Sequence, residues 1–281
     1  MKKTILVIGA NAALAKAVIP VLSKGNTIIT AGRKNCDIVC DITRPIKIPD
    51  GIDVLINFAA SFGGERDDEI VDALQTNVLG TLEICKAAKK AHVAHVVLIS
   101  SIFTLLDDTS PFYSIYALTK KHADELALFY CKRNGIPLTI LRPSRIYGDE
   151  NTFEKNQQFL YHMVDHAQKG EDIVLYGTND AARNYIHSSD LAEIVRRVID
   201  RRHEGVYACT SPKNSTYSQI AHAAQRIFGR GGSVRFAADK PDIPSDTFPL
   251  DQAIYKKIAY QPTISMEAGL ERIKKYREGK L

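Results

Sequence analysis

Short, mostly apolar runs alternate with longer segments of helical pattern through the first half of the chain, and this alternation constrains the fold more than any other feature. The runs suited to strands are Thr4–Ile8, Thr27–Thr30, Val54–Phe58, Val96–Ile99 and Leu138–Leu141. Helical segments follow several of them, among them Val71–Lys90 and Ile115–Arg133. Strands that are apolar at every position are typical of a parallel sheet covered by helices on both faces. The pattern therefore predicts a doubly wound α/β domain.

The alternation ends near Tyr147. Beyond it, the pattern predicts helices at Asn151–Lys169, Ser188–Arg201 and Ser265–Arg277, strands at Ile173–Leu175 and Gly205–Cys209, and a loop rich in Gly, Pro and Asp at Gly229–Pro249. The strand at Gly205–Cys209 could return to the main sheet. We therefore expect a larger domain of residues 1–148 and about 186–211, and a smaller, interleaved C-terminal substrate-binding lobe of about residues 149–185 and 212–281.

Composition excludes several classes of protein. The formal net charge is +5 and the basic residues are scattered, so we expect no nucleic-acid surface. The apolar run after Lys2 and Lys3 imitates a secretory signal, but we favour a first strand followed by a turn. No apolar run approaches the roughly 20 residues needed to span a membrane. Five cysteines without a CxxC pair indicate reduced thiols in a cytoplasmic protein. His162 and His166 have no third ligand in view, so no metal site is expected.

The segment after the first strand has the spacing of a dinucleotide-binding turn. Gly9 keeps the first glycine of a GxxGxxG motif, whereas Ala12 and Ala15 replace the other two. In such turns, backbone N–H groups at the helix start bind the pyrophosphate, and glycines allow its close approach. We expect Gly9, Asn11, Ala12 and Leu14 to line the turn of a Rossmann domain, with cofactor affinity retained or weakened by the alanines. An ordinary strand followed by an Ala-rich helix is the alternative.

The end of the second strand bears on the choice of cofactor. A carboxylate there would bind the adenosine ribose hydroxyls and repel a 2′-phosphate. The segment Ile28–Lys34 has no carboxylate, and Arg33 is placed to pair with a phosphate. We therefore expect NADP to be preferred, with NAD still possible; a solvated loop cation is the alternative. Asp41 could accept a hydrogen bond from the adenine amino group, or could be a turn residue.

Tyr116 and Lys120 stand one helical turn apart on the same helix face. A nearby ammonium favours tyrosinate, and so lowers a phenol pKa that is ordinarily about 10. Such a phenol can exchange a proton with an alcohol or a ketone near neutral pH. Ser100 and Ser101 follow an apolar strand at its carboxyl end, where ligands bind in such sheets. A hydroxyl there can hydrogen-bond the carbonyl that is being reduced. The structural alternatives are a Tyr packed on the core, a solvated Lys and a pair of serines that caps a helix.

Taken together, these stretches resemble the extended short-chain dehydrogenases/reductases of the NAD(P)-dependent epimerase/dehydratase family. The resemblance covers essentially the whole chain, and the order of the stretches is more specific than any one of them. They are the degenerate glycine turn at Gly9, DIT at Asp41, NFAA at Asn57, NVLGT at Asn77, ISS at Ser100, YALTK at Tyr116, LRPSRIYG at Arg142 and RNYIHSSDLA at Arg183.

The resemblance implies a role for each candidate residue. Tyr116 would be the acid–base, Lys120 would lower its pKa and bind the nicotinamide ribose, and Ser101 would orient the substrate oxygen. Arg183 would contact a nucleotide diphosphate, unless it is a structural ion-pair partner. Family members typically act on nucleotide-linked sugars and commonly form homodimers through two helices per subunit. The other residues implied to line the cofactor site are Ile42, Phe58, Ala59, Ala60, Asn77 and Pro143.

One departure from the family's pattern limits the chemistry. Ile102 and Phe103 follow Ser101, where 4,6-dehydratases usually carry acidic residues. Apolar side chains cannot remove and return protons, so dehydration is not expected. Reduction of a keto-sugar and epimerisation through a transient ketone both remain; an NADP preference favours the reductase, and family membership favours the epimerase.

Three hypotheses of function follow. The first is a reductase or epimerase of a nucleotide-linked sugar, which would fit polysaccharide biosynthesis. The second is a catalytically silent dinucleotide-binding sensor or scaffold, suggested by the altered glycine turn but opposed by the presence of Ser101, Tyr116 and Lys120. The third is a reductase of a non-sugar ketone, for which Arg183 would be unnecessary.

Overall fold

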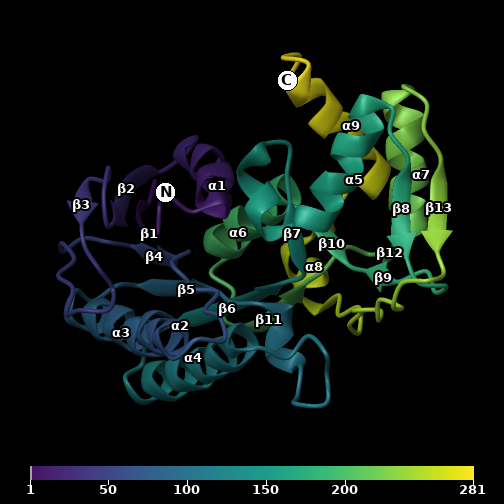
Figure 1. Cartoon of the computed structure of the whole chain (residues 1–281). Coiled ribbons are helices and arrows are strands. Elements are labelled where there is room, and N and C mark those ends of the chain that lie inside the picture. Colours follow the sequence, from purple (N-terminus) through teal and green to yellow (C-terminus); the bar gives the residue numbers. More distant parts are fainter. Residues whose placement is uncertain (1) are drawn as a thin grey trace. The chain divides into compact units, whose positions relative to one another are not determined.

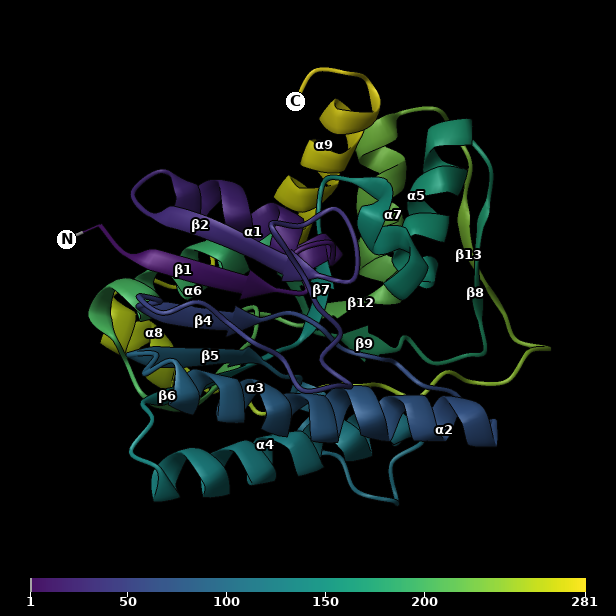
Figure 2. The same cartoon turned by 90° about the vertical axis from the view of Figure 1, so that its left-hand side faces the viewer.

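The computed structural model describes residues 2–281, which form two compact units. The first contains the chain up to Pro143 together with Ala192–Cys209 and Gln252–Tyr260. The second contains Ser144–Leu191, Thr210–Asp251 and Gln261–Leu281. Figures 1 and 2 show the elements of both units, coloured along the sequence. Among the described residues, no helix combines the length and the apolar character needed to cross a bilayer.

A seven-stranded sheet forms the centre of the first unit. Its strand order is β11-β6-β5-β4-β1-β2-β3, and every neighbouring pair is parallel. The strands are β1 (Thr4–Ile8), β2 (Thr27–Gly32), β3 (Ile38–Val39), β4 (Val54–Asn57), β5 (His95–Ile99), β6 (Leu138–Pro143) and β11 (Gly205–Cys209). The central strands are mostly apolar because both of their faces are buried. The predicted doubly wound parallel sheet is confirmed.

Helices cover both faces of this sheet. Figures 1 and 2 show α1 (Ala13–Ser23) on one face, and α3 (Gly80–Lys90) and α4 (Ile115–Arg133) on the other. Residues Ala192 onward of α6 (Ser188–Arg201) also belong to this unit. A fully buried cluster fills the space between sheet and helices, and its members include Leu6, Leu55, Ile84, Val96, Ala127 and Ile140.

The segment predicted as one helix at Val71–Lys90 is interrupted in the structure. It consists of α2 (Asp67–Ala73), a π-helical turn at Leu74–Leu79 and α3. A π-helical turn inserts an extra residue into the helix and commonly marks a functional site. Here the turn contains Asn77, whose side chain is buried and hydrogen-bonded to groups outside the helix. Periodicity alone could not predict it, because the partners of Asn77 lie elsewhere in the chain.

The unit boundaries differ from the predicted domain limits. The first break falls after Pro143 rather than near residue 148, and the chain re-enters the first unit at Ala192 rather than near residue 186. Residues 252–260, expected in the smaller lobe, belong to the first unit with α8 (Ala253–Ile258). Carbonyl groups at the end of α8 accept hydrogen bonds from Arg197 and His203, which explains this placement.

The second unit contains three two-stranded sheets. The pairs are β7 (Arg145–Tyr147) with β10 (Tyr185–His187), β8 (Ile173–Tyr176) with β13 (Val234–Ala237), both parallel, and β9 (Ala182–Arg183) with β12 (Ser215–Thr216), antiparallel. Its helices are α5 (Gln158–Lys169), α7 (Tyr217–Phe228) and α9 (Met266–Arg277), and α7 packs against both others. The predicted loop at residues 229–249 thus contains a strand, β13. The predicted helix Asn151–Lys169 divides into a 3-10 turn at Asn151–Asn156 and α5.

Candidate active site

The glycine turn joins β1 to α1 at the carboxyl edge of the sheet. Gly9 has a φ of +74°, and a Cβ on it would lie 2.5 Å from the amide nitrogen of Ala59. Glycine is therefore required here both by the backbone conformation and by the close approach of the next strand's end. Ala12 has φ −64° and ψ 145°, which any residue adopts, and Ala15 is fully buried within α1. Alanine at these two positions causes no backbone strain.

The N-terminus of α1 suits an anion such as a pyrophosphate. Its first turn contains no acidic residue, and among the described side chains none caps it with a hydrogen bond. Unpaired N–H groups and the helix dipole favour negative charge at such a position. Asn11 is exposed beside it, and its Nδ2 donates to the carbonyl oxygen of Lys34 at 2.7 Å. Leu14, the second residue of α1, is almost completely buried.

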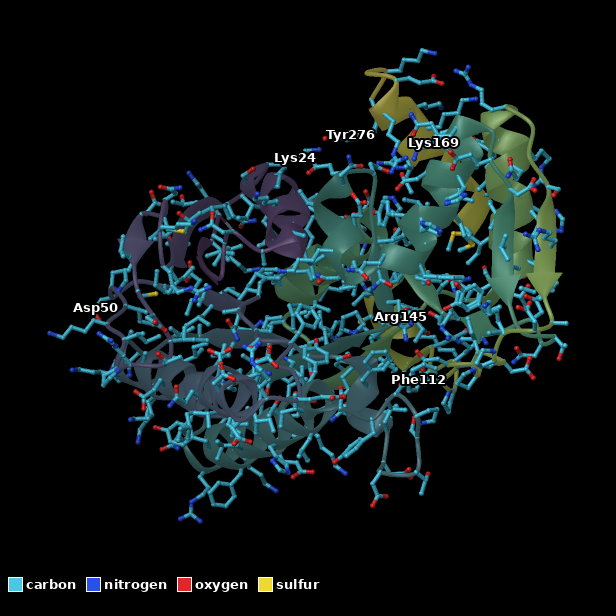
Figure 3. The ribbon with its side chains drawn as sticks, viewed as in Figure 1. Lys24, Asp50, Phe112, Arg145, Lys169 and Tyr276 are labelled. Carbon is cyan, nitrogen blue, oxygen red and sulfur yellow. The ribbon has the colours of Figure 1, made fainter. Side chains whose placement is uncertain are left out.

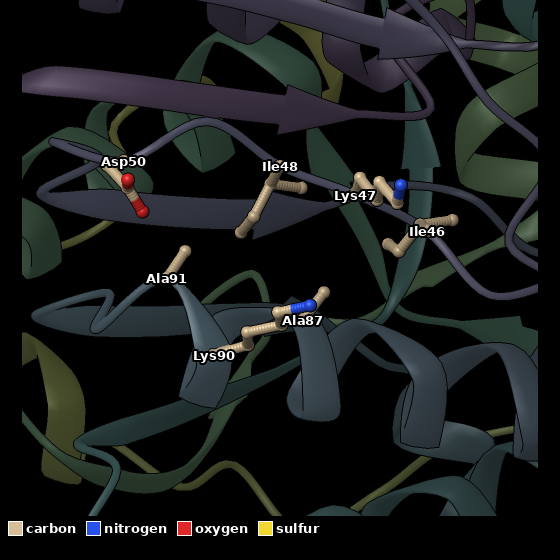
Figure 4. Close-up of a pocket in the computed structure, with 7 residues that line it drawn as sticks. All are labelled: Ile46, Lys47, Ile48, Asp50, Ala87, Lys90 and Ala91. Atoms are coloured by element: carbon tan, nitrogen blue, oxygen red, sulfur yellow. The ribbon is translucent and has the colours of Figure 1, made fainter.

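Arg33 lines a pocket of about 490 Å3 with other charged residues from the loop after β3. The charged lining residues are Arg33, Asp41, Arg44 and Lys47. Local sequence does not indicate Arg44 and Lys47 as part of this site, because their proximity to Arg33 depends on the pairing of β2 with β3. Lys47 also lines a smaller pocket of about 180 Å3 near the end of α3, with Asp50 and Lys90 (Figure 4).

Asp41 is a turn residue in the structure. Its carboxylate accepts hydrogen bonds from the backbone N–H of Thr43 at 3.0 Å and from the Thr43 hydroxyl at 2.9 Å. The backbone bond is the main reason that the pKa of Asp41 lies below its ordinary value, with smaller effects from Arg33 and Arg44. Ile42 beside it is buried and fills the space that a Cβ on Gly80 would need. The adenine contact expected of Asp41 remains a prediction.

The end of β4 is shaped by Asn57. Its Oδ1 accepts a hydrogen bond from the backbone N–H of Ala59 at 2.9 Å, which turns the chain away from the sheet. Phe58 is buried, Ala59 is partly exposed and Ala60 is exposed at this edge. Pro143, the last residue of β6, is buried.

Ser101, Tyr116 and Lys120 come together at the carboxyl end of β5. Ser101 caps a 3-10 turn at Ile102–Leu105 by accepting from the N–H of Phe103 at 3.2 Å, and it also hydrogen-bonds the Tyr116 phenol. Tyr116 and Lys120 lie in the first half of α4, which Ser114 caps. The Lys120 Nζ donates to the carbonyl oxygen of Ile99, the last residue of β5, at 2.8 Å. The predicted constellation is thus assembled from two segments, the end of β5 with the turn that follows it and the start of α4.

The pKa of Tyr116 is raised in this structure, whereas the helical spacing to Lys120 predicts a lowered one. Burial raises the pKa of Tyr116 to about 12; the hydrogen bond from Ser101 opposes this, and the nearby Asp124 carboxylate adds to it. Burial also lowers the pKa of Lys120, while Asp124 raises it. Desolvation disfavours the charged form of both groups, and it outweighs the attraction that helical spacing alone predicts. Tyr116 is therefore a protonated phenol at neutral pH.

Asp124, one turn beyond Lys120 on α4, is a third buried ionisable group beside Tyr116 and Lys120, and it is not among the candidate residues predicted from the sequence. Its Oδ2 accepts from the Nε of Arg142 on β6 at 2.9 Å. Burial raises the pKa of Asp124, whereas Ser100, Lys120 and Arg142 lower it. The spacing of Tyr116, Lys120 and Asp124 is visible in the sequence, but the partner Arg142 comes from a different element.

A second missed feature is the ring of Phe62, in the loop after β4. It stacks on the Tyr116 ring with centroids 4.8 Å apart and an interplanar angle of 25°. Asn77 bonds the backbone of this loop and the hydroxyl of Thr119 on α4, and the cofactor contact expected of it remains a prediction.

In the second unit, Arg183 is buried. Its Nη1 donates to the carbonyl oxygens of Ala182 at 2.9 Å and Pro244 at 2.8 Å, and its guanidinium lies 4.9 Å from the centroid of the Tyr217 ring. Arg145, labelled in Figure 3, binds the buried Asp246 through Nη2 at 2.6 Å. The diphosphate contact expected of Arg183 remains a prediction.

The first unit defines a class of protein. A parallel sheet in this order, a glycine turn at the carboxyl end of β1 and an uncapped helix start form a dinucleotide-binding fold. A serine, a tyrosine and a lysine at the same sheet edge add the polar groups that short-chain dehydrogenases/reductases use.

Comparisons with known proteins identify the family within this class. The chain belongs to the NAD dependent epimerase/dehydratase family, whose model matches residues 5–209, and it is thus an enzyme of the extended short-chain dehydrogenase/reductase type. A trifunctional UDP-glucose 4,6-dehydratase/UDP-4-keto-6-deoxy-D-glucose 3,5-epimerase/UDP-4-keto-L-rhamnose-reductase of Arabidopsis thaliana is 24% identical over 255 residues. That match covers 83% of this chain but only 37% of the Arabidopsis protein, so the chain spans little more than a third of that relative's length.

Solved structures share the fold over nearly the whole chain. UDP-N-acetylglucosamine 4-epimerase from Bacillus cereus has a TM-score of 0.79 at 19% identity, with 99% of this chain and 97% of that chain covered. The Bordetella bronchiseptica enzyme WbmF, solved in complex with NADH, has a TM-score of 0.78 at 17% identity, with 99% and 92% covered.

Proposed function

We propose that the protein is a reductase or epimerase of a nucleotide-linked sugar that acts by hydride transfer with Tyr116 as the acid–base. The observation that carries this proposal is the convergence of Ser101, Tyr116 and Lys120 at the carboxyl end of β5. A nicotinamide cofactor, when bound, supplies or accepts the hydride. Gly9 and the uncapped start of α1 fit its pyrophosphate.

The chain's own residues handle the proton. In reduction, the Tyr116 phenol donates its proton to the carbonyl oxygen while the Ser101 hydroxyl hydrogen-bonds the same oxygen. Lys120, one helical turn from Tyr116 on the same helix face, is the cation assigned to stabilise the tyrosinate that results, against the desolvation that raises the pKa of the phenol. Because the pKa of Tyr116 is about 12 in the ligand-free protein, the phenol holds its proton at neutral pH. The protonated phenol is the form that donates a proton when a ketone is reduced.

Epimerisation through a transient ketone is the second candidate. Structural relatives such as the Bacillus cereus enzyme are 4-epimerases, which supports this alternative. Dehydration is not proposed, because Ile102 is buried and both it and Phe103 lack an ionisable group. A role in polysaccharide biosynthesis and a cytoplasmic location belong to the proposal; the five free cysteines are consistent with a reducing compartment.

We also propose that NADP is preferred over NAD. The argument is the positive lining of the pocket beside Arg33, to which Arg44 and Lys47 contribute. Guanidinium groups pair well with a phosphate such as the one on the adenosine ribose of NADP. Solved relatives are described with NAD or NADH, so NAD is the competing assignment.

A homodimer is part of the proposal. Large apolar side chains are exposed along α2, the π-helical turn and α4, and exposed patches of this kind commonly mark protein interfaces. They are Val71, Leu74, Leu79, Leu128 and Phe129. Light scattering after size exclusion tests the dimer, and Phe129→Glu is expected to yield monomers.

Turnover by Tyr116→Phe tests the catalytic assignment. Oxidation of NADPH or NADH is followed at a fixed pH with a panel of 4-keto nucleotide sugars. The variant is expected to lose at least about a thousandfold in turnover while it still binds cofactor, because the acid is removed. Tyr130→Phe, on the same helix, is the matched control and should retain activity. Retained turnover in Tyr116→Phe would remove Tyr116 from the mechanism, and a wild type that binds cofactor but turns over nothing would favour the sensor or scaffold.

A further inference from the structure

Phe62 is an exposed aromatic residue held in one defined place. Its side chain is 56% exposed, yet its ring stacks on Tyr116 with centroids 4.8 Å apart and planes 25° apart. Offset stacking of this kind stabilises an aromatic pair beyond the burial of area. A large apolar ring at the surface is not explained by core packing, because its second face remains in solvent.

The backbone before Phe62 is clamped from both sides by one buried amide. Asn77 Oδ1 accepts from the N–H of Ser61 at 2.9 Å, and Asn77 Nδ2 donates to the carbonyl oxygen of Ser61 at 2.8 Å. The same Nδ2 donates to the hydroxyl of Thr119 on α4 at 2.9 Å. Thr119 lies between Tyr116 and Lys120 in the helix, so this network ties the Phe62 loop directly to the helix that carries the proposed acid–base.

The backbone after Phe62 is equally constrained. Gly63 has a φ of +65°, and a Cβ on it would lie 2.6 Å from Cγ2 of Ile115, the residue before Tyr116. The N–H of Gly63 donates to the Ser61 hydroxyl at 3.3 Å, and that hydroxyl donates to Asp72 at 2.5 Å. Both flanks of Phe62 are therefore held against α2 and α4, which fixes the position of its ring on the Tyr116 ring.

We propose that Phe62 determines substrate specificity: it covers one face of Tyr116 and offers its own exposed face to the C–H face of a neutral sugar ring. The face of an aromatic ring carries partial negative charge and has no hydrogen-bond donors, so it accepts C–H groups and disfavours a carboxylate. The proposal rests on the proposed function and deepens it, because it selects neutral hexoses and deoxyhexoses over uronic acids.

The first test needs no ligand. Tyrosinate absorbance is titrated against pH in wild type, Phe62→Ala and Phe62→Leu. The same three proteins with Tyr116→Phe added show which part of each titration curve belongs to Tyr116. Removal of the cover in Phe62→Ala should lower the pKa of Tyr116, with about tenfold more tyrosinate at a given pH. Phe236→Ala, which removes another exposed Phe, is the matched control and should leave the pKa of Tyr116 unchanged. Coincident curves for wild type and both Phe62 variants would overturn the covering role.

The second test measures the binding of UDP, UDP-glucose and UDP-glucuronic acid by calorimetry in the presence of NADP. Wild type should bind UDP-glucose more tightly than UDP-glucuronic acid. Phe62→Ala should weaken UDP-glucose binding about tenfold and leave UDP unchanged, because only the sugar meets the ring. Phe62→Lys should reverse the preference towards UDP-glucuronic acid.

The outcomes separate this inference from the proposed function. If Phe62→Ala binds UDP and UDP-glucose equally more weakly than wild type, or binds both as tightly, Phe62 is not the sugar contact. Turnover by wild type and its loss in Tyr116→Phe would still support the proposed enzyme in that case. Failure of wild type to bind any nucleotide sugar in a panel extended to dTDP- and GDP-sugars would refute both the nucleotide-sugar function and the substrate part of this inference.

Discussion

The carboxylate of Asp149 allows a stability measurement in the second unit that requires no substrate. Arg272 donates to both of its oxygens, from Nε at 2.9 Å and from Nη2 at 2.6 Å, and Nε2 of His187 lies 3.0 Å from Oδ1. The N–H of Ser189 donates to Nδ1 of His187, so the ring proton is on Nε2 and points to Asp149. Burial raises the pKa of Asp149, but the hydrogen bonds from His187 and Arg272 outweigh it and hold the pKa at about 2.

The magnitude follows from linkage between protonation and folding. The difference between the ordinary pKa of 3.8 and the folded value of about 2 corresponds to about 2.5 kcal/mol in the free energy of unfolding. Because the folded pKa is the lower one, this stabilisation is present above pH 3.8 and is lost as the pH falls towards 2. Asp149→Asn should therefore lower the free energy of unfolding by about 2.5 kcal/mol at neutral pH, and the difference from wild type should shrink steadily below about pH 4.

Urea unfolding followed by circular dichroism at several pH values measures this difference. Glu267→Gln is the matched control, because its ion pair with Arg226 is 63% exposed on both sides. Exposed pairs contribute at most about 1 kcal/mol, so the control should change little. An Asp149→Asn deficit that is absent at neutral pH, or that stays the same at low pH, would refute the reasoning.

Three further predictions concern the first unit. Gly9→Ala should destabilise the fold by at least about 1 kcal/mol and abolish cofactor binding, because the new Cβ meets the Ala59 backbone. Thermal unfolding and cofactor titration measure the two effects, and normal cofactor binding would contradict the prediction. Arg33→Asp should shift preference from NADP to NAD, and an unchanged affinity ratio would argue against the phosphate contact. Asp124→Asn should lower the pKa of Lys120, so turnover should fall off at a lower alkaline pH than in wild type, with Asp124→Glu restoring the profile. An identical pH profile for Asp124→Asn would exclude Asp124 as a positioning residue.

Local pattern was sufficient for most of the elements. The apolar runs and the helix Ile115–Arg133 lie where the sequence predicts them, because strand and helix preferences depend on neighbouring residues. The spacing of Tyr116 and Lys120 likewise places both on one face of α4. Boundaries that depend on packing were not predictable in this way: residues 252–260 join the first unit through bonds to Arg197 and His203.

The electrostatics of the site were decided by the tertiary structure. The YxxxK spacing predicts an acidified phenol, whereas burial in the folded chain raises the pKa of Tyr116 to about 12. Desolvation depends on everything packed around a group, and a sequence motif does not contain that information. The same holds for Asp124, whose partner Arg142 comes from β6.

The sequence by itself determined which elements form, and which residues share one helix face or end one strand, because both follow from local periodicity. Only the tertiary structure decided that Phe62 stacks on Tyr116, that Asn77 fixes the loop between them, and that Arg44 joins Arg33 in one pocket. These contacts join residues from different elements. Their existence depends on how the elements stack, which no single segment specifies.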